Sequence, residues 1–137
     1  KNDALLITGG CTGVMESASQ GAKTAGGITV GTPGRERFSS NDFIDVEICT
    51  PIDVGDYIFA GIWSCDAIIV LPGDAGTIAE LAMAYRLKKP LIFIKGYQED
   101  ILQKLFGSIT DDYPLAVATN SKIAVKIAIQ LAKSSLT

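Results

Sequence analysis

Short apolar runs alternate with amphipathic stretches along this chain, and the alternation predicts a parallel α/β sheet. The clearest run spans Ala67 to Leu71, is rich in β-branched residues, and lies between Asp66 and the pair Pro72-Gly73. This pattern is typical of a central strand that is buried on both faces. Further strands are predicted at residues 4–8, 28–30, 44–48, 91–94 and 114–119.

Helical periodicity follows most of the apolar runs. One stripe runs from Ile78 to Tyr85, and another runs from Val14 to Ala25 before Gly26-Gly27 ends it. Other helices are predicted at residues 51–64, 99–106 and from Asn120 or Ser121 onward, the last with Ile123, Ile127 and Leu131 facing inward. The pattern predicts a single domain over residues 1–137.

The chain starts at Lys1, without a methionine, and its first strand opens almost at once. The printed sequence is therefore expected to lack an N-terminal strand and helix, which would normally occupy the centre of the sheet.

Three apolar runs end in glycine clusters, at residues 9–13, 31–34 and 73–76. Ligands of open α/β sheets bind beyond the carboxyl ends of the strands. A helix that starts there offers unpaired N–H groups and a partial positive charge, which suit a phosphate or a carboxylate. The same glycines could instead serve only tight packing.

Thr77 and Glu80 allow two interpretations. Thr-x-x-Glu at a helix start forms a capping box. The threonine side chain accepts from the third helical N–H, and the glutamate side chain accepts from the backbone N–H of the threonine. Glu80 could also be a catalytic carboxylate, although the spacing alone favours the cap. The polar segment 35–43 is predicted to be a mobile loop, in which Arg35 and Arg37 could clamp a phosphate.

Composition excludes several classes of chemistry. The 137 residues include no histidine, which removes Ser-His-Asp and Cys-His catalysis and His-ligated metals. The three cysteines share no metal-ligand spacing, so no metal site is predicted, and reduced thiols in the cytoplasm are expected. A net charge of −3 disfavours nucleic acid, and no apolar run approaches the roughly 20 residues that span a bilayer.

Three stretches together resemble the lysine-decarboxylase-like superfamily of Rossmann folds, which holds the LOG phosphoribohydrolases and the molybdenum cofactor carrier-like proteins. They span Thr8 to Gly31, Ser64 to Glu80 and Lys88 to Ile94. The superfamily motif Pro-Gly-Gly-x-Gly-Thr-x-x-Glu matches Pro72 to Glu80, with Asp74 replacing the second glycine. The resemblance implies a Rossmann-like, doubly wound parallel sheet flanked by helices.

The resemblance also implies a homodimer or higher homo-oligomer that binds a nucleotide-like small molecule. No cofactor is required, and molybdenum cofactor (molybdopterin) is a candidate for the carried ligand. Asp74 adds a negative charge that weakens anion binding at its turn. The residues predicted to contact the ligand or its phosphate are Gly9, Gly10, Thr12, Gly13, Glu16, Pro33, Gly34, Arg35, Gly73, Asp74, Ala75, Gly76 and Thr77.

In the hydrolases, the glutamate that matches Glu80 works with an arginine of the preceding helix to cleave the N-glycosidic bond of a nucleoside monophosphate. Here the arginine position holds Tyr57, and its usual lysine neighbour is Ile58. The GxxGVME-type sequence at Gly10–Glu16 and the TPGR-type loop at Thr32–Arg35 resemble the carrier-like branch more than the hydrolases. A binding protein is therefore expected. Two alternatives stay open: a phosphoribohydrolase in which Arg35 or a partner residue holds phosphate, and a relic whose glycines serve only the fold.

Overall fold

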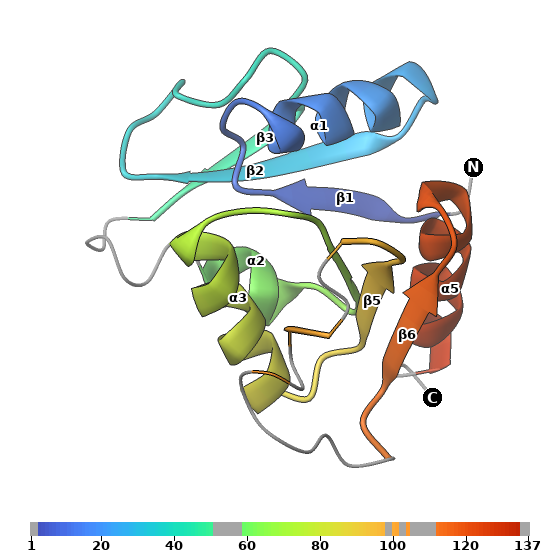
Figure 1. The fold of residues 1–137 in the computed structure, drawn as a ribbon. Coiled ribbons are helices and arrows are strands. Elements are labelled where there is room, and N and C mark those ends of the chain that lie inside the picture. Colours follow the sequence, from blue (N-terminus) through green and yellow to red (C-terminus); the bar gives the residue numbers. More distant parts are fainter. Residues whose placement is uncertain (1–2, 51–58, 98–99, 102–103, 105–111, 135–137) are drawn as a thin grey trace. The chain divides into compact units, whose positions relative to one another are not determined.

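The computed structural model describes residues 3–50, 59–97, 100–101, 104 and 112–134. The chain divides into two compact units, Lys1–Cys65 and Asp66–Thr137, which Figure 1 colours from blue to red along the sequence. Each unit holds a three-stranded sheet, and every strand pair is parallel. The predicted α/β class with parallel strands is therefore confirmed, whereas the single domain stays a prediction. Within the described ranges, no helix is long and apolar enough to cross a membrane.

The first unit orders its strands β1-β2-β3. These are β1 (Leu5–Thr8), β2 (Ile28–Gly34) and β3 (Val46–Cys49), and β1 pairs with the first half of β2. Helix α1 (Val14–Thr24) connects β1 to β2 and packs on both, as Figure 1 shows. Helix α2 (Ala60–Ser64) is the described part of the helix predicted at 51–64, because residues 51–58 lie outside the described ranges.

Strand β2 is longer than predicted, because it continues past residue 30 through Gly34. Its pairing with β3 shifts between Gly31 and Gly34, which marks an irregularity of the bulge type. Pro33 lacks an N–H group but is tolerated here, since proline in sheets is confined to edges and bulges. The Gly-Thr-Pro-Gly sequence is thus part of a strand and not a turn.

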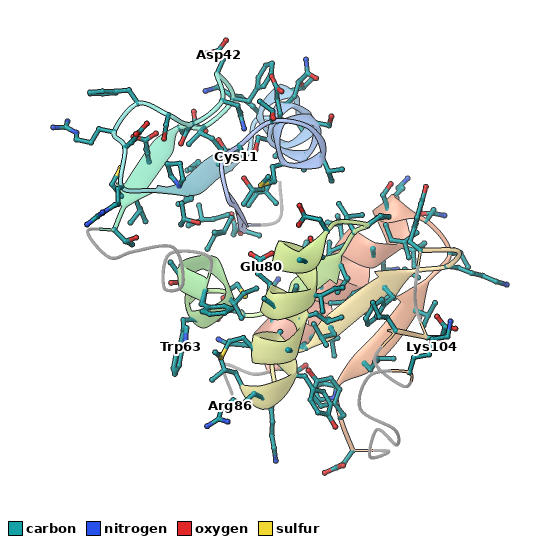
Figure 2. The ribbon with its side chains drawn as sticks, turned by 60° about the vertical axis from the view of Figure 1, so that its left-hand side comes forward. Cys11, Asp42, Trp63, Glu80, Arg86 and Lys104 are labelled. Carbon is teal, nitrogen blue, oxygen red and sulfur yellow. The ribbon has the colours of Figure 1, made fainter. Side chains whose placement is uncertain are left out.

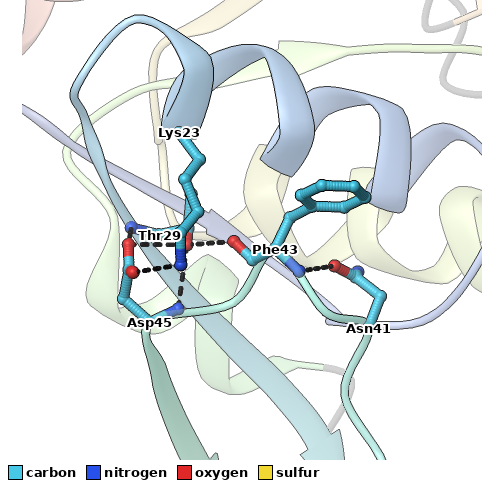
Figure 3. A network of polar contacts seen from close by, with 5 residues as sticks. All are labelled: Lys23, Thr29, Asn41, Phe43 and Asp45. Carbon is cyan, nitrogen blue, oxygen red and sulfur yellow. Dashed lines mark hydrogen bonds and ion pairs between the residues drawn. The ribbon is translucent and has the colours of Figure 1, made fainter.

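Figure 3 shows a polar network that ties the segment before β3 to β2. The fully buried Thr29 has its hydroxyl 2.5 Å from the Phe43 carbonyl oxygen, and that hydroxyl accepts the Asp45 N–H at 3.0 Å. Asp45 in turn accepts from the Thr29 N–H at 3.0 Å and from Lys23 Nζ at 2.6 Å. The segment 35–43 is irregular, as predicted, but these bonds fix its C-terminal end.

The second unit orders its strands β4-β5-β6, namely β4 (Ile68–Val70), β5 (Leu91–Ile94) and β6 (Leu115–Ala118). Strand β5 lies between the other two and all four of its residues are buried, so β5 is the centre of this sheet. The prediction of a central strand at 67–71 is wrong for this sheet, because β4 lies at an end of the order and Ile68 and Ile69 are only half-buried. Helix α3 (Ala75–Arg86) follows β4, and helix α5 (Ser121–Ser134) packs on the sheet. The helix predicted at 99–106 lies largely outside the described residues.

Helix α5 confirms most of its predicted features. The Asn120 Oδ1 accepts the Ile123 N–H at 3.0 Å, so Asn120 caps the helix. Ile127 and Leu131 pack against the core formed by Ile92, Ile94, Ala118 and Ala124. Ile123 was expected to face inward but is 37% exposed, because it lies on the first turn beside the cap.

The Thr29 hydroxyl gives the first testable prediction. Thr29→Val keeps the shape of the side chain but leaves the Asp45 N–H and the Phe43 carbonyl without this partner. We expect the free energy of unfolding to fall by about 1–3 kcal/mol, measured by urea titration. Thr32→Val is the matched control on the same strand, because the Thr32 hydroxyl is also buried but lies 3.4 Å from its acceptor, the Thr8 carbonyl. Equal losses in the two variants would contradict the role of the network.

Candidate functional site

The loop between β1 and α1 holds the first group of predicted ligand residues. Gly10 and Gly13 have φ angles of 79° and 76°, a region that L side chains rarely adopt. Gly13 is the N-cap of α1, and no side chain accepts a hydrogen bond from this helix start within the described part of the chain. The first N–H groups of α1 therefore have no side-chain cap, and the anion-binding turn stays a prediction.

Asn41 holds this loop in place, and sequence reasoning missed it. Its backbone N–H donates to the Gly10 carbonyl at 2.8 Å, and its Nδ2 donates to the carbonyls of Gly10 and Cys11 at 3.0 and 2.8 Å. Its Oδ1 accepts the Phe43 N–H at 3.0 Å, a bond that Figure 3 marks. Because 30 residues separate Asn41 from the loop, no local pattern could have revealed this contact. Asn41 keeps two carbonyl oxygens occupied next to the open helix start.

The glycine at position 10 is also required by a close backbone approach. A Cβ atom added to Gly10 would lie 3.2 Å from the Gly31 Cα and 3.0 Å from the Ser40 Oγ. A Cβ atom added to Gly31 would lie equally close to the Gly10 Cα. Tight packing therefore explains Gly31, whereas Gly10 combines packing with its positive φ.

The remaining predicted residues of the first unit differ in exposure. Thr12 and Arg35 are exposed, Gly9, Glu16 and Pro33 are half-buried, and Gly34 is buried at the end of β2. Arg35 therefore follows β2 at its carboxyl end, where a ligand could reach it. A hollow of about 650 Å³ lies in the same unit, lined by Arg37, Phe38, Ser40, Asn41, Ile44, Asp45, Glu47 and Cys49.

Glu47 fixes the middle of the segment 35–43. Its carboxylate accepts the backbone N–H groups of Phe38 and Ser40 at 2.5 and 2.9 Å. The Ser40 hydroxyl beside the carboxylate, together with these two N–H groups, lowers the pKa of Glu47 from 4.5 to about 2. Strand β3 therefore places beside this segment a carboxylate that stays ionised in mildly acidic solution.

The turn between β4 and α3 holds the second group of predicted residues. The N-cap of α3 is Asp74, whose Oδ1 accepts the Gly76 N–H at 3.0 Å. The predicted capping box of Thr77 and Glu80 is therefore wrong, because the helix already begins at Ala75 and both residues lie inside it. The Thr77 side chain instead packs on Gly73, where an added Cβ would lie 2.8 Å from the Thr77 Cβ.

Glu80 lies on α3, where Figure 2 labels it. It is half-buried, and desolvation raises the pKa of its carboxyl group, with a further contribution from the negative charge of Asp74. A raised pKa favours the protonated form of the carboxyl group, which can donate a proton or a hydrogen bond. Because Asp74 and not the Thr77–Glu80 pair caps the helix, Glu80 remains the predicted catalytic residue of this unit.

The two glycine turns are thus of one kind, strand to turn to helix. They define a Rossmann-like protein in which both turns lie at the carboxyl ends of parallel strands, where ligands of open α/β sheets bind. The chain belongs to the SLOG cluster4 family, which its sequence matches over residues 1–131. This membership confirms the predicted superfamily.

Similarity to individual proteins agrees with this assignment. An uncharacterized protein of Archaeoglobus fulgidus is 37% identical over 91 residues, which make up 66% of this chain, and the match spans 60% of that protein's length. The structure of the molybdenum cofactor binding protein of Rippkaea orientalis is 32% identical, with a TM-score of 0.75, over 97% of this chain and 78% of that one. The molybdenum cofactor carrier protein of Chlamydomonas reinhardtii is 31% identical, with a TM-score of 0.71, over 96% and 77% of the two chains. The predicted Rossmann-like fold is confirmed, and the carrier-like branch fits.

The pKa of Glu47 gives a prediction for acid stability. Because the folded value of about 2 lies below the ordinary 4.5, Glu47 contributes stability that is fully present above pH 4.5 and is lost as the pH falls toward 2. Glu47→Gln should therefore lose stability at pH 7 and show a flatter decline between these pH values, measured by urea unfolding. Glu36→Gln, in the segment 35–43 that Glu47 contacts, should keep the wild-type decline. A wild-type decline in Glu47→Gln would refute the assignment.

The raised pKa of Glu80 predicts a pH dependence of stability with the opposite sign. Its folded pKa is raised, so the folded state holds the proton more tightly than the unfolded state, and stability falls as the pH rises above 4.5. Glu80→Gln removes this cost, so its melting temperature should exceed that of the wild type at pH 7 and match it below pH 4.5. Glu16→Gln, which removes a favourable charge from the first turn of α1, should show no such gain. A Glu80→Gln variant less stable than the wild type at pH 7 would contradict the desolvated carboxyl group.

Proposed function

We propose that this chain is a non-catalytic binding protein of the carrier type, with molybdenum cofactor or a similar phosphorylated, nucleotide-like molecule as its cargo. The observation that carries the proposal is its likeness to molybdenum cofactor carrier and binding proteins over 96–97% of its length. We further propose that it acts as a homodimer in the cytoplasm.

The turn at the start of α1 suits the phosphate of such a cargo. Gly13 places no side chain over the helix start, and the first N–H groups of α1 have no side-chain cap among the described residues. Asn41 bonds the Gly10 and Cys11 carbonyls, so two oxygens that would repel an anion are already paired. The cargo's phosphate would therefore meet donors at this turn.

The arrangement around Glu80 supports binding more than hydrolysis. Cleavage of an N-glycosidic bond in the phosphoribohydrolases pairs the glutamate with a guanidinium group, but this chain has Tyr57 at that position, outside the described residues. Arg86, on the same helix as Glu80, follows it by six residues, which is about 9 Å along the helix axis. Arg86 is the only arginine among the described residues of this unit, so within them Glu80 has no guanidinium group beside it to hold the phosphate.

Thermal denaturation with molybdenum cofactor tests the proposal. A ligand that binds the folded state stabilises it by RT ln(1 + [L]/Kd), which is about 2.7 kcal/mol at 100 times Kd. We expect the cofactor to raise the melting temperature, and we expect no free base after incubation with AMP, monitored by liquid chromatography. Base release that Glu80→Gln abolishes would overturn the proposal in favour of a hydrolase. Absence of stabilisation by the cofactor would also overturn it.

Two glycines of α1 provide a matched pair of variants. Gly13 and Gly26 lie at opposite ends of the helix, both have positive φ, and an added Cβ would meet nothing within 4 Å at either. Gly13→Ala and Gly26→Ala should each cost about 1 kcal/mol of stability through backbone strain. Only Gly13→Ala should also weaken cofactor binding, by about fivefold or more, in a calorimetric titration. Equal weakening by both variants would place the phosphate away from this turn.

A further inference from the structure

Phe38 is the most exposed large hydrophobic residue in the described part of the chain, with 86% of its surface open to solvent. Its backbone has a φ angle of 64°, in the left-handed region that bulky residues rarely adopt. Exposure forgoes the free energy that burial of an aromatic ring would contribute, and the left-handed backbone adds strain. Stability alone therefore does not explain a phenylalanine at this position.

Two neighbouring side chains hold Phe38 in this exposed conformation. The Glu47 carboxylate accepts the Phe38 N–H at 2.5 Å, which fixes the strained backbone. The guanidinium carbon of Arg37 lies over the Phe38 ring, 4.9 Å from its centre, so the cation covers one face of the ring. Because the side chain is so exposed, the ring as a whole still faces solvent. The segment thus presents a flat aromatic surface in a fixed orientation.

Phe38 and Arg37 both line the hollow of about 650 Å³, a size within the roughly 300–1,000 Å³ that is typical of small-molecule sites. Two carboxylates also line it, and both are already bonded within the chain. Asp45 pairs with Lys23, as Figure 3 shows, and Glu47 accepts two backbone N–H groups. Arg37 is the one cation among the described residues of the lining, so the hollow suits a neutral ring better than an anionic group.

The hollow adjoins the turn between β1 and α1 through Asn41. This residue lines the hollow, and its Nδ2 donates to the carbonyls of Gly10 and Cys11 at 3.0 and 2.8 Å. The proposed phosphate site and the hollow therefore share a residue. Neighbouring sites of this kind suit a molecule that has a phosphate at one end and a planar ring at the other.

We propose that Phe38, with Arg37 against its ring, is a stacking platform for the planar heterocycle of the ligand, a pterin or purine ring that enters the hollow. This inference rests on the proposed function for the ligand and adds the residues that bind its ring. Heterocycles stack on aromatic side chains with little dependence on their identity, because every such ring has a π face. The strained, exposed conformation of Phe38 is then the conformation that keeps its ring accessible to the ligand.

The test titrates the full chain with 6-hydroxymethylpterin and, separately, with adenosine, neither of which carries a phosphate. Nuclear magnetic resonance follows the backbone amides of residues 37–49. We expect ring-current shifts at Phe38, an affinity about tenfold lower in Phe38→Leu, and little change in Phe38→Tyr, which keeps the ring. Trp63→Leu should match the wild type, because Trp63 is another exposed aromatic residue of the same unit but does not line the hollow. The two affinities show which heterocycle the hollow prefers.

Phe38→Asn separates ligand binding from a role of the ring in folding. Asparagine tolerates the left-handed backbone better than phenylalanine does. The variant should therefore melt at or above the wild-type temperature while it binds both rings as weakly as Phe38→Leu. A lower melting temperature would show that the ring of Phe38 stabilises the fold, and this result would contradict the inference.

Three binding results would also overturn the inference. These are the absence of amide shifts in the wild type at millimolar concentrations of either ring, unchanged affinity in Phe38→Leu, and an equal loss of affinity in Trp63→Leu. Failure here is distinct from failure of the proposed function, because the probes contain neither phosphate nor metal. If molybdenum cofactor stabilises the wild type and Phe38→Leu equally, the carrier function stands and the platform at Phe38 is rejected.

Discussion

The close approach of the Gly10 and Gly31 backbones is the constraint on which the turn between β1 and α1 depends. Neither position tolerates a Cβ atom without displacing the other strand end, since each would lie 3.2 Å from the opposite Cα. This approach leaves room for Ser40 and Asn41 to reach the loop, and Asn41 then bonds the Gly10 and Cys11 carbonyls. The geometry at the start of α1 thus depends on the close contact between these two glycines.

Local sequence patterns predicted the strands well where the strands are continuous apolar runs. Residues 91–94 became β5 without change, because burial on both faces leaves an unmistakable run of aliphatic residues. Residues 4–8 became β1 almost without change, although Leu5 is exposed and the rest of the strand is half-buried. Strand β2 was predicted too short, since Gly31 and Pro33 are typical of turns in most contexts. What kept them in the strand was a contact with the Gly10 loop and an irregular pairing with β3, neither of which a local pattern contains.

The site was predicted less completely, and for related reasons. The glycine turns were located by their position after strands, but the sequence favoured Thr77 as the cap of α3 because Thr77 and Glu80 have the spacing of a capping box. The structure selects Asp74, which starts the helix one turn earlier and gives Glu80 a different environment. Asn41 and Glu47 escaped prediction because their partners lie in other elements, at separations that only the fold brings together.

A carrier passes through an empty state each time it delivers its cargo, and the cap on α3 bears on that state. In many anion-binding turns the ligand itself completes the hydrogen bonding of the helix start, so the loop loses order when the ligand leaves. Here Asp74 completes the Gly76 bond from within the chain. The start of α3 therefore has a cap that does not depend on a ligand, so the ordering entropy of that turn would not be lost anew at each loading of the proposed carrier.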